Sequence, residues 1–419
     1  MSLSVYIVAF ALTQAAPLTM DQAVAIALAR NRDLIAARLD VEAAQVERVA
    51  AGIYPNPDFS YSYGNIVLGE ANSQGMMLRP GSFDQGVQTL AVTQVLDVWL
   101  KRSARKEAAD RGVDQARLRV EDALREVVYA VRAAFADVAR EQHERDLARE
   151  TRSRYDETVR LSRARFKAGD ISEAELKKIE LESLKYQNGE IDAQMELDLA
   201  WHKLAALLGF GSPAALPSVA AEKPPERAPL SLSDLTARTL NERPDLRAVR
   251  MSQRKAQADL SAARREALPE PALGVAYTHD DFTVSGDNPN SLALTLSFPL
   301  PLFDRNQGGI GRAQVDLRRA GNDEQKLLLA IQREVAEAVR RAVRARSLLD
   351  VFEGGGMLER SDSALRVAEK SYKAGAVSLL ELLEAQRTYI ETRAQYLRTV
   401  YDYEQARIDI DHAVGAQVH

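Results

Sequence analysis

The stretches FKAGDIS at residues 166–172 and YKAGAVS at residues 372–378 decide the architecture of this chain. They are the centres of two longer stretches, 154–209 and 360–415, that align without a gap at a constant offset of 206 residues. A repeat of this length is too long for one unit of a solenoid, so the chain is a tandem duplication of a larger unit. The fold therefore depends on what one copy contains.

Each copy begins upstream of that match and keeps the same order of segments. Residues 27–34 correspond to 239–246, and PNP at 55–57 corresponds to PEP at 269–271. The predicted order is a helix, the Pro-x-Pro, a middle segment, a long helix, a Gly-Ser break and a second helix. We predict repeats at 17–209 and 232–415, followed by a short tail at 416–419. The proline-rich residues 210–231 are the predicted linker, because proline lacks the amide that helices and sheets use.

Composition narrows the class of protein. The chain has 419 residues, of which 46% are hydrophobic, 27% charged and only 6% aromatic. Few aromatic residues with many Ala, Leu, Arg and Glu are typical of helices packed side by side. A net charge of −5 argues against the basic surface that nucleic-acid binding requires. The absence of cysteine excludes disulfides, thiolate metal sites and cysteine nucleophiles.

Residues 1–16 are interpreted as the remnant of a signal peptide. LSVYIVAFAL at residues 3–12 has the length of a signal-peptide apolar core and is followed by small residues. No lysine or arginine precedes it, and a fragment of an ordinary helix stays the alternative. No other run approaches the roughly 20 apolar residues of a spanning helix. If the chain enters a membrane, it must do so as strands.

Four segments show the alternation of a strand: residues 59–63, 87–95, 273–277 and 292–298. Period two places one face on an apolar medium and the other on water, as in a strand of an outer-membrane barrel. A small soluble four-stranded sheet is the alternative for these segments alone. Four strands cannot enclose a barrel and lipid does not tolerate open edges, so the chain would share a barrel with copies of itself.

The predicted helices are unusually long. Proline is absent from 101–167 and from 311–373, where apolar residues recur every three or four positions. About 65 residues at 1.5 Å each reach about 100 Å, so these helices must lie against partners in a coiled-coil wall. Gly354-Gly355-Gly356 interrupts the second helix, and each glycine costs about 1 kcal/mol relative to alanine. We predict a local unwinding or bulge there and assign it no function.

With these features, the chain resembles the TolC-like outer-membrane efflux protein family over nearly its whole length. The resemblance rests on YKAGAVS followed by LLELLEAQ at 379–386. LSFPLPLFDRNQGG at 296–309 is similar to the branch that serves heavy-metal resistance-nodulation-division (RND) pumps, the CzcC- and CusC-like branch. The resemblance implies a mainly α fold with a small β part. It is a TolC-like trimeric α-helical coiled-coil barrel plus a shared twelve-stranded outer-membrane β-barrel, with four strands per chain.

The resemblance also assigns roles at the two Gly-Ser breaks, which in this family are periplasmic helix tips that meet the adaptor protein. Gly169 and Gly375 are suited to helix C-caps. Ser172 and Ser378 are suited to the N-caps of the helices that follow. We therefore expect these four residues to form the helix-tip turns and the adaptor contact.

The expected gate lies just beyond the second tip. By resemblance, Glu381 and Glu384 stand where the family places the acidic rings that narrow the entrance, and three copies of each would attract cations. An ordinary solvated helix face is the alternative for this pair alone. In the first copy Lys178 occupies the place of Glu384. The family's latch joins a tyrosine to a carboxylate of the neighbouring helix pair, and Tyr372 and Glu175 hold those positions.

The sequence predicts no cofactor, no resident metal and no catalytic centre. Five histidines are scattered without a His-x-x-x-His pair, and His279-Asp280-Asp281 is interpreted as a solvated outer loop. There is no Gly-x-Ser-x-Gly, no phosphate-binding glycine loop and no His-Glu-x-x-His. We therefore expect that the protein is not an enzyme.

The expected function is the exit duct of a tripartite RND efflux system in the outer membrane of a Gram-negative bacterium, extending into the periplasm. Heavy-metal cations are the expected cargo. The expected partners are two further copies in a homotrimer, a periplasmic adaptor (membrane fusion) protein, an inner-membrane RND pump and outer-membrane lipid, with no nucleic acid. A multidrug or type I secretion exit duct of the same fold is one alternative. A periplasmic structural coiled-coil scaffold is the other.

Overall fold

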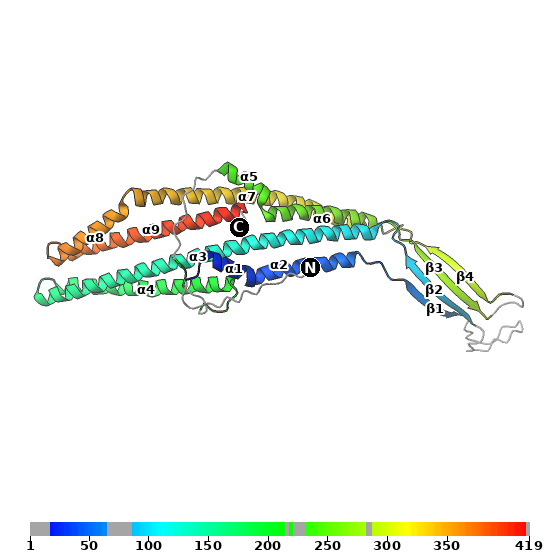
Figure 1. Cartoon of the computed structure of the whole chain (residues 1–419), viewed down its shortest axis with the longest axis horizontal. Coiled ribbons are helices and arrows are strands. Elements are labelled where there is room, and N and C mark those ends of the chain that lie inside the picture. The colour runs from blue at the N-terminus through cyan, green and yellow to red at the C-terminus, as the bar shows by residue number, and fades with distance from the viewer. Residues whose placement is uncertain (1–16, 65–85, 214–217, 221–231, 282–286, 416–419) are drawn as a thin grey trace. The chain divides into compact units, whose positions relative to one another are not determined.

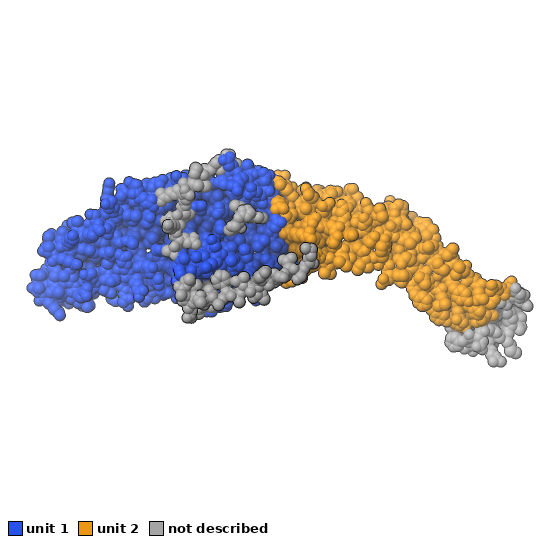
Figure 2. Space-filling view, viewed as in Figure 1, with its two compact units in different colours: residues 1–38, 119–246, 327–419 blue, residues 39–118, 247–326 orange. Residues whose placement is uncertain are grey.

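The structure is a computed structural model that describes residues 17–64, 86–213, 218–220, 232–281 and 287–415 (Figure 1). The predicted signal-peptide remnant, the tail and most of the predicted linker lie outside these residues. The chain folds into two compact units, coloured separately in Figure 2. The hairpin unit comprises residues 1–38, 119–246 and 327–419, and the sheet unit comprises 39–118 and 247–326. Each unit draws on both halves of the sequence.

The sheet unit contains one antiparallel sheet. Its described strands are β1 (Asp58–Gly64), β2 (Val87–Val95), β3 (Ala272–Asp280) and β4 (Asn290–Ser297), paired in that order. The four predicted strands are confirmed to within a few residues. His279 and Asp280, interpreted above as loop residues, are the last residues of β3, because the ladder continues there opposite Gln88 and Val87.

Polar contacts in the sheet unit fix the helix ends next to the sheet. Helix α3 begins at Lys101, and the carboxylate of Asp97 accepts hydrogen bonds from the amides of Lys101 and Arg102 at 2.6 and 3.1 Å. Arg102 in turn donates to the carbonyl of Gly52 at 3.0 Å, just past α2 (Arg32–Ala51). The buried ammonium of Lys101 lies 3.6 Å from the carboxylate of Glu266, the last residue of α6 (Pro244–Glu266). These contacts join the ends of α2, α3 and α6.

The hairpin unit is made of long helices that fold back on themselves (Figure 1). Helix α3 (Lys101–Ala168) has 68 residues and returns as α4 (Glu173–Leu207). In the second half, α7 (Gln307–Gly354) and α8 (Met357–Lys373) return as α9 (Leu379–Val414). Two short helices, α1 (Met20–Arg30) and α5 (Leu232–Glu242), complete the described elements. Among the described residues, no helix combines the length and apolar character needed to span a bilayer.

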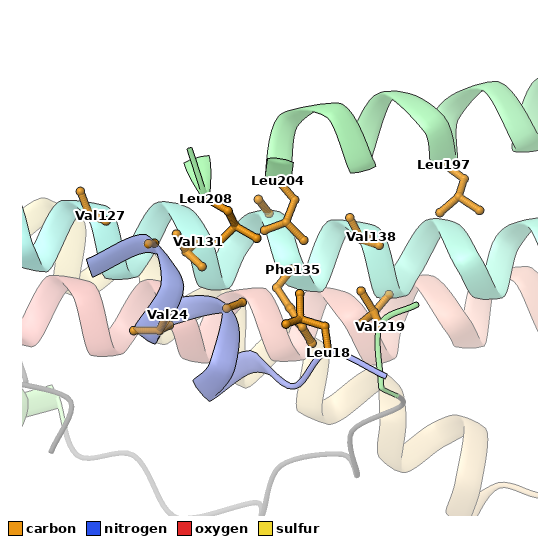
Figure 3. Close-up of a cluster of buried hydrophobic side chains, with 14 of the residues drawn as sticks. Leu18, Val24, Val127, Val131, Phe135, Val138, Leu197, Leu204, Leu208 and Val219 are labelled. Atoms are coloured by element: carbon orange, nitrogen blue, oxygen red, sulfur yellow. The ribbon is translucent and has the colours of Figure 1, made fainter. Parts of the chain in front are cut away.

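The core of the first half lies where α1, α3 and α4 meet. Figure 3 shows Val131, Phe135 and Val138 of α3 pointing into a cluster that also contains Leu204 of α4. Leu18, just before α1, enters the same cluster and pairs through its backbone with Val219 in a parallel bridge. These side chains are all nearly inaccessible to solvent. Burial of this apolar face, rather than helix propensity, stabilises such long helices.

The two copies close their hairpins at the same place. In the first copy the amide of Asn31 donates to the carbonyl of Leu207 at 3.0 Å, near the end of α4. In the second, the guanidinium of Arg243 donates to the carbonyl of Ala413 at 3.1 Å, near the end of α9. The glycine two residues after each carbonyl has a φ of +75°, the left-handed conformation that ends a helix. The last carbonyls of each hairpin therefore find partners within the same copy.

Arg243 also organises a buried ionic cluster. Its guanidinium lies 2.6 Å from the carboxylate of Asp245 and 2.8 Å from that of Glu334, and Arg125 lies 3.7 Å from Asp245. Burial raises the pKa of the Asp245 carboxyl, but its hydrogen bonds to Arg243 and the two positive charges outweigh burial, and the net pKa is lowered. Asp245 is therefore stabilised in its ionised form.

The Asp245→Asn substitution should destabilise the protein by about 3 kcal/mol at pH 7, because it removes one partner of a buried ion pair. A lowered native pKa gives stability that is present above the unfolded pKa and is lost as pH falls through the native one. The difference between wild type and variant should therefore shrink as pH falls below 3.8, the ordinary value. Guanidinium unfolding followed by circular dichroism measures it.

Glu334→Gln is the matched control. This side chain is 38% exposed and also pairs with Arg243, so its loss should cost less than about 1 kcal/mol. Equal losses in the two variants, or a loss in Asp245→Asn that persists in acid, would contradict the assignment.

Candidate functional site

The four strands share one apolar face. Residues directly opposite one another in a ladder lie on the same face, and the register aligns Leu294, Val275, Val92 and Phe59 across the sheet. Apart from the half-buried Tyr63, the large apolar side chains of this face are exposed to solvent in the single chain. The set is Phe59, Tyr61, Leu90, Val92, Leu273, Val275, Tyr277, Leu292, Leu294 and Leu296. An apolar face of this extent needs an apolar environment.

The opposite face carries small and hydroxyl side chains. Thr89 and Thr278 face each other across β2 and β3 with their Oγ1 atoms 3.2 Å apart. Apart from Asp58 at the start of β1, the central rows of this face consist of Ser60, Ser62, Thr89, Ala91, Thr93, Gly274, Ala276, Thr278, Ser291, Ala293 and Thr295. Such a face can border water without filling the space in front of it. A sheet with these two faces is suited to separate an apolar medium from an aqueous one.

The two Gly-Ser breaks form matching helix tips. Gly169 and Gly375 have φ values of +85° and +76°, which only glycine adopts readily. Ser172 and Ser378 are the N-caps of α4 and α9, and each hydroxyl accepts a hydrogen bond from the amide three residues on. The two helices of each hairpin therefore join through a short turn.

Two of the predicted site carboxylates close these caps. Glu175 accepts a hydrogen bond from the amide of Ser172 at 3.0 Å, and Glu381 accepts one from the amide of Ser378 at 3.3 Å. Each is the third residue of a capping box. The match between Glu175 and Glu381 in the two copies therefore has a structural cause.

Glu384 lies one turn beyond Glu381 and has no such task. Within the described part of the chain, no hydrogen bond or ion pair joins its carboxylate to another residue, although the guanidinium of Arg387 three residues on lies close enough to interact with it electrostatically. Glu381 and Glu384 together line a cavity of about 290 Å³ between α8 and α9, with Ser361 and Thr388 among the other lining residues. Of the two predicted gate carboxylates, only Glu381 closes a helix cap, and the gate itself stays a prediction.

Tyr372 is buried between the two hairpins. Its hydroxyl lies 3.0 Å from the hydroxyl of Ser162 on α3, and both residues are inaccessible to solvent or nearly so. The guanidinium of Arg165 covers the tyrosine ring and donates to the Tyr372 carbonyl at 3.3 Å. Tyr372 and Glu175 thus have different hydrogen-bond partners in this chain, and a latch between them stays a prediction.

Comparison with known proteins identifies the family. The sequence profile described as "Outer membrane efflux protein" matches residues 23–210 and 235–416. The chain belongs to the outer membrane efflux protein family. The cobalt-zinc-cadmium resistance protein CzcC of Cupriavidus metallidurans is 24% identical over 96% of this chain and 91% of its own. The pyoverdine export protein OpmQ of Pseudomonas putida is 26% identical over 94% and 85%. The solved structure of CusC shares the fold, with a TM-score of 0.75, 20% identity and coverage of 95% and 92%.

Membership of this family accounts for the geometry of the sheet and the hairpins. The efflux protein is a channel component of the outer membrane, not an enzyme. The strands supply the part that enters the membrane, and the helical hairpins supply the part that extends into the periplasm. Within the described residues, no group of three or more histidine, aspartate or glutamate side chains could hold a metal ion.

A buried polar seam joins the hairpins of the efflux protein, and sequence reasoning missed most of it. The amide of Gln386 on α9 donates to the hydroxyl of Thr158 on α3 at 3.1 Å, where both side chains are buried. Nearer the surface Arg154 of α3 donates to the carboxylate of Glu369 on α8 at 3.2 Å. Ser162 follows Tyr155 and Val159 at the spacing of a core face, so a polar residue at that position was the available signal. The seam holds α3 against α8 and α9 near the tips.

A double-mutant cycle in the efflux protein can measure the coupling free energy between the hydroxyls of Tyr372 and Ser162 in this seam. Tyr372→Phe should lower the free energy of unfolding by about 1–3 kcal/mol, because it leaves the buried Ser162 hydroxyl without that partner. Ser162→Ala should cost a similar amount, and the double variant should cost less than the sum, with a coupling of about 1 kcal/mol. Denaturant unfolding of all four proteins gives the coupling. Strict additivity would show that the contact contributes nothing.

Proposed function

We propose that three copies of this efflux channel assemble into one duct. The observation that carries the proposal is the two-faced sheet, whose edge strands β1 and β4 have no outer partner among the described residues. Unpaired strand edges are not tolerated in hydrocarbon, and the smallest membrane barrels need about eight strands. Three chains would close a twelve-stranded barrel, with the apolar face toward lipid and the hydroxyl face toward the pore.

The helices support the same assembly. Helix α4 carries an apolar stripe that is exposed in the single chain, formed by Leu181, Leu184, Ile191, Met195 and Leu199. Helices α7 and α8 carry further exposed apolar side chains, which include Val343 and Val351 on α7 and Val367 on α8. The residues of the α4 stripe recur at helical spacing and so lie along one side of that helix. We propose that the α4 stripe of one chain packs against these exposed side chains of α7 and α8 of the next, which repeats around a closed ring.

Heavy-metal cations are the cargo that we propose. Similarity to CzcC over almost the whole of both chains supports this assignment, as does the junction sequence at residues 296–309. Similarity to the pyoverdine exporter OpmQ is of the same degree, and it supports export of an organic molecule as the second candidate. In both cases the duct would serve an inner-membrane RND pump through a periplasmic adaptor that docks at the tips around Gly169, Ser172, Gly375 and Ser378.

We propose that Glu384, with Glu381, forms the acidic constriction at the periplasmic end. Threefold assembly would bring three copies of each carboxylate to one axis and favour cations there. Tyr372, held by Ser162, is the proposed latch in the state seen here. Its partnership with Glu175 is proposed only for a state in which the Ser162 contact is released.

Single-channel recording in planar bilayers tests the gate. Glu384→Ala should raise conductance and lower the preference for cations over anions, because it removes three negative charges from a constriction. Glu384→Lys, which installs the residue that the first copy carries as Lys178, should lower cation preference further. Asp192→Ala is the control, because it removes an exposed carboxylate of the other hairpin, away from its tip, without touching Glu384. Unchanged selectivity in both Glu384 variants would reject the gate assignment.

A deletion strain tests the cargo. Loss of the gene should increase sensitivity to one or more of cobalt, zinc, cadmium, copper, silver and nickel, and the intact gene should restore growth. Common antibiotics and an iron-chelating siderophore form the comparison set. Sensitivity confined to antibiotics, or accumulation of the siderophore inside the cell, would overturn the metal assignment and favour the second candidate.

A further inference from the structure

The break between α7 and α8 has a specific backbone geometry. Helix α7 ends at Gly354, and α8 starts at Met357 after Gly356, whose φ of +64° is left-handed. A Cβ atom on Gly355 would lie 2.3 Å from the carbonyl oxygen of Val351, closer than real side chains approach. A Cβ on Gly354 would meet nothing within 4 Å. Two of the three glycines are therefore required by this conformation, and one is not.

The first copy shows that the break is not a general property of the repeat. At the equivalent positions α3 has Ala148, Arg149 and Glu150, and it continues through them as one helix from Lys101 to Ala168. Figure 1 shows α3 passing this level without interruption, whereas the ribbon changes direction between α7 and α8. Glycine is a usual cause of such a kink.

The packing on the tip side of the break also differs between the copies. In the first hairpin Tyr155 stacks on Tyr186 at 4.1 Å and packs with the fully buried Ile179. The matching positions in the second hairpin are Ser361, Thr392 and Ala385. Ser361 and Ala385 line the cavity of about 290 Å³ described above. At these three positions the larger side chains of the first hairpin pack against one another. The smaller side chains of the second hairpin leave a cavity where α8 faces α9.

We propose that Gly355 and Gly356 form a hinge, about which α8 turns toward or away from α9 to open and close the periplasmic end of the duct. The role in opening rests on the proposed function, whereas the hinge itself does not. Bending is inexpensive at these two residues because they have no side chains, and the cavity between α8 and α9 gives α8 space to move. Tight packing around Tyr155 and Ile179 would prevent an equivalent motion in the first hairpin.

Distance measurements between spin labels test the hinge directly. The chain has no cysteine, so an Arg346→Cys/Lys370→Cys pair labels only this segment, at solvent-accessible positions that are not among the apolar residues proposed to meet the next chain. Labelled chains are mixed with excess unlabelled wild type, so that each assembly carries one pair. Arg140→Cys/Ala164→Cys is the matched pair across the unbroken α3, at the equivalent positions of the first copy. A straight helix would separate either pair by about 36 Å.

The hinge predicts a shorter and broader distribution for the 346–370 pair than for the 140–164 pair. Replacing Gly354-Gly355-Gly356 by the first copy's Ala-Arg-Glu should give a narrow distribution near the straight-helix value. Gly354→Ala should change nothing, whereas Gly355→Ala should shift the distribution. A wild-type distribution identical to that of α3, or one that the Ala-Arg-Glu replacement leaves unchanged, would overturn the hinge.

Conductance tests whether the motion opens the duct. In planar bilayers the Ala-Arg-Glu replacement should reduce the frequency of opening several-fold, and Gly354→Ala should behave as wild type. Normal opening in a protein whose distances show a straightened helix would overturn the role in gating. If the wild type itself never conducts, the proposed duct fails, and the distance measurements still decide whether the hinge exists.

Discussion

The structure depends on helices that are stable only against one another. Helix α3 has 68 residues and no proline, and a helix of that length has no globular core to lie on. Its apolar positions are instead buried segment by segment, against α1 and α4 in one cluster and against the tips of both hairpins in another. The protein is therefore held together by a long line of contacts rather than by a centre. In the single chain, the apolar stripe on α4 is exposed to solvent and lacks a packing partner of this kind among the described residues.

The tandem duplication provides two such sets of packed helices. The two copies have the same backbone structure at the hairpin ends and at the tips, where the chain turns. Near the end of each hairpin, a backbone carbonyl accepts a hydrogen bond from the side chain at an equivalent position, which is Asn31 in the first copy and Arg243 in the second. Both tips contain a glycine and a capping box that begins with serine. Backbone groups at helix ends need hydrogen-bond partners in either copy. The residues that supply those partners are therefore constrained in sequence. Side chains between the ends had no such constraint. Tyr155 and Ser361 occupy equivalent positions, but Tyr155 fills the space between its helices whereas Ser361 lines a cavity.

The strands, the long helices and the tip turns could be predicted from the sequence because each has a local cause. Alternation at 292–298 and the absence of proline from 101–167 are properties of short windows of sequence. Gly354-Gly355-Gly356 predicted the break for the same reason. The hydrogen-bond partners of individual side chains were harder to predict. Neither the bond from Tyr372 to Ser162 nor the seam through Gln386 follows from spacing, because each joins residues more than 200 positions apart.

The predicted role of Glu381 shows a second limit. Its position three residues after Ser378 already fits a capping box, so the sequence contained the local explanation as well as the functional one. Both can hold for one carboxylate, because the cap uses only one of its oxygen atoms. Glu384 had no competing local explanation of this kind, since it closes no helix cap and interacts electrostatically with Arg387. A candidate site residue is better supported when no local structural task accounts for it.

The distribution of charge separates the two ends of the proposed duct. On the hydroxyl face of the sheet, ionisable side chains occur only at the ends, Asp58 and Asp280, with serine, threonine, alanine and glycine between them. A wide pore with such a lining exerts little preference among solutes, because it offers neither a fixed charge nor a close fit. In the proposed duct, discrimination would then fall to a narrower and charged part of the passage, such as the proposed constriction at Glu384. Relatives of this family carry names as different as cobalt-zinc-cadmium resistance and pyoverdine export. A barrel with the proposed lining would accept either cargo, and Glu384, which corresponds to Lys178 in the first copy, is the residue that we propose imposes a preference.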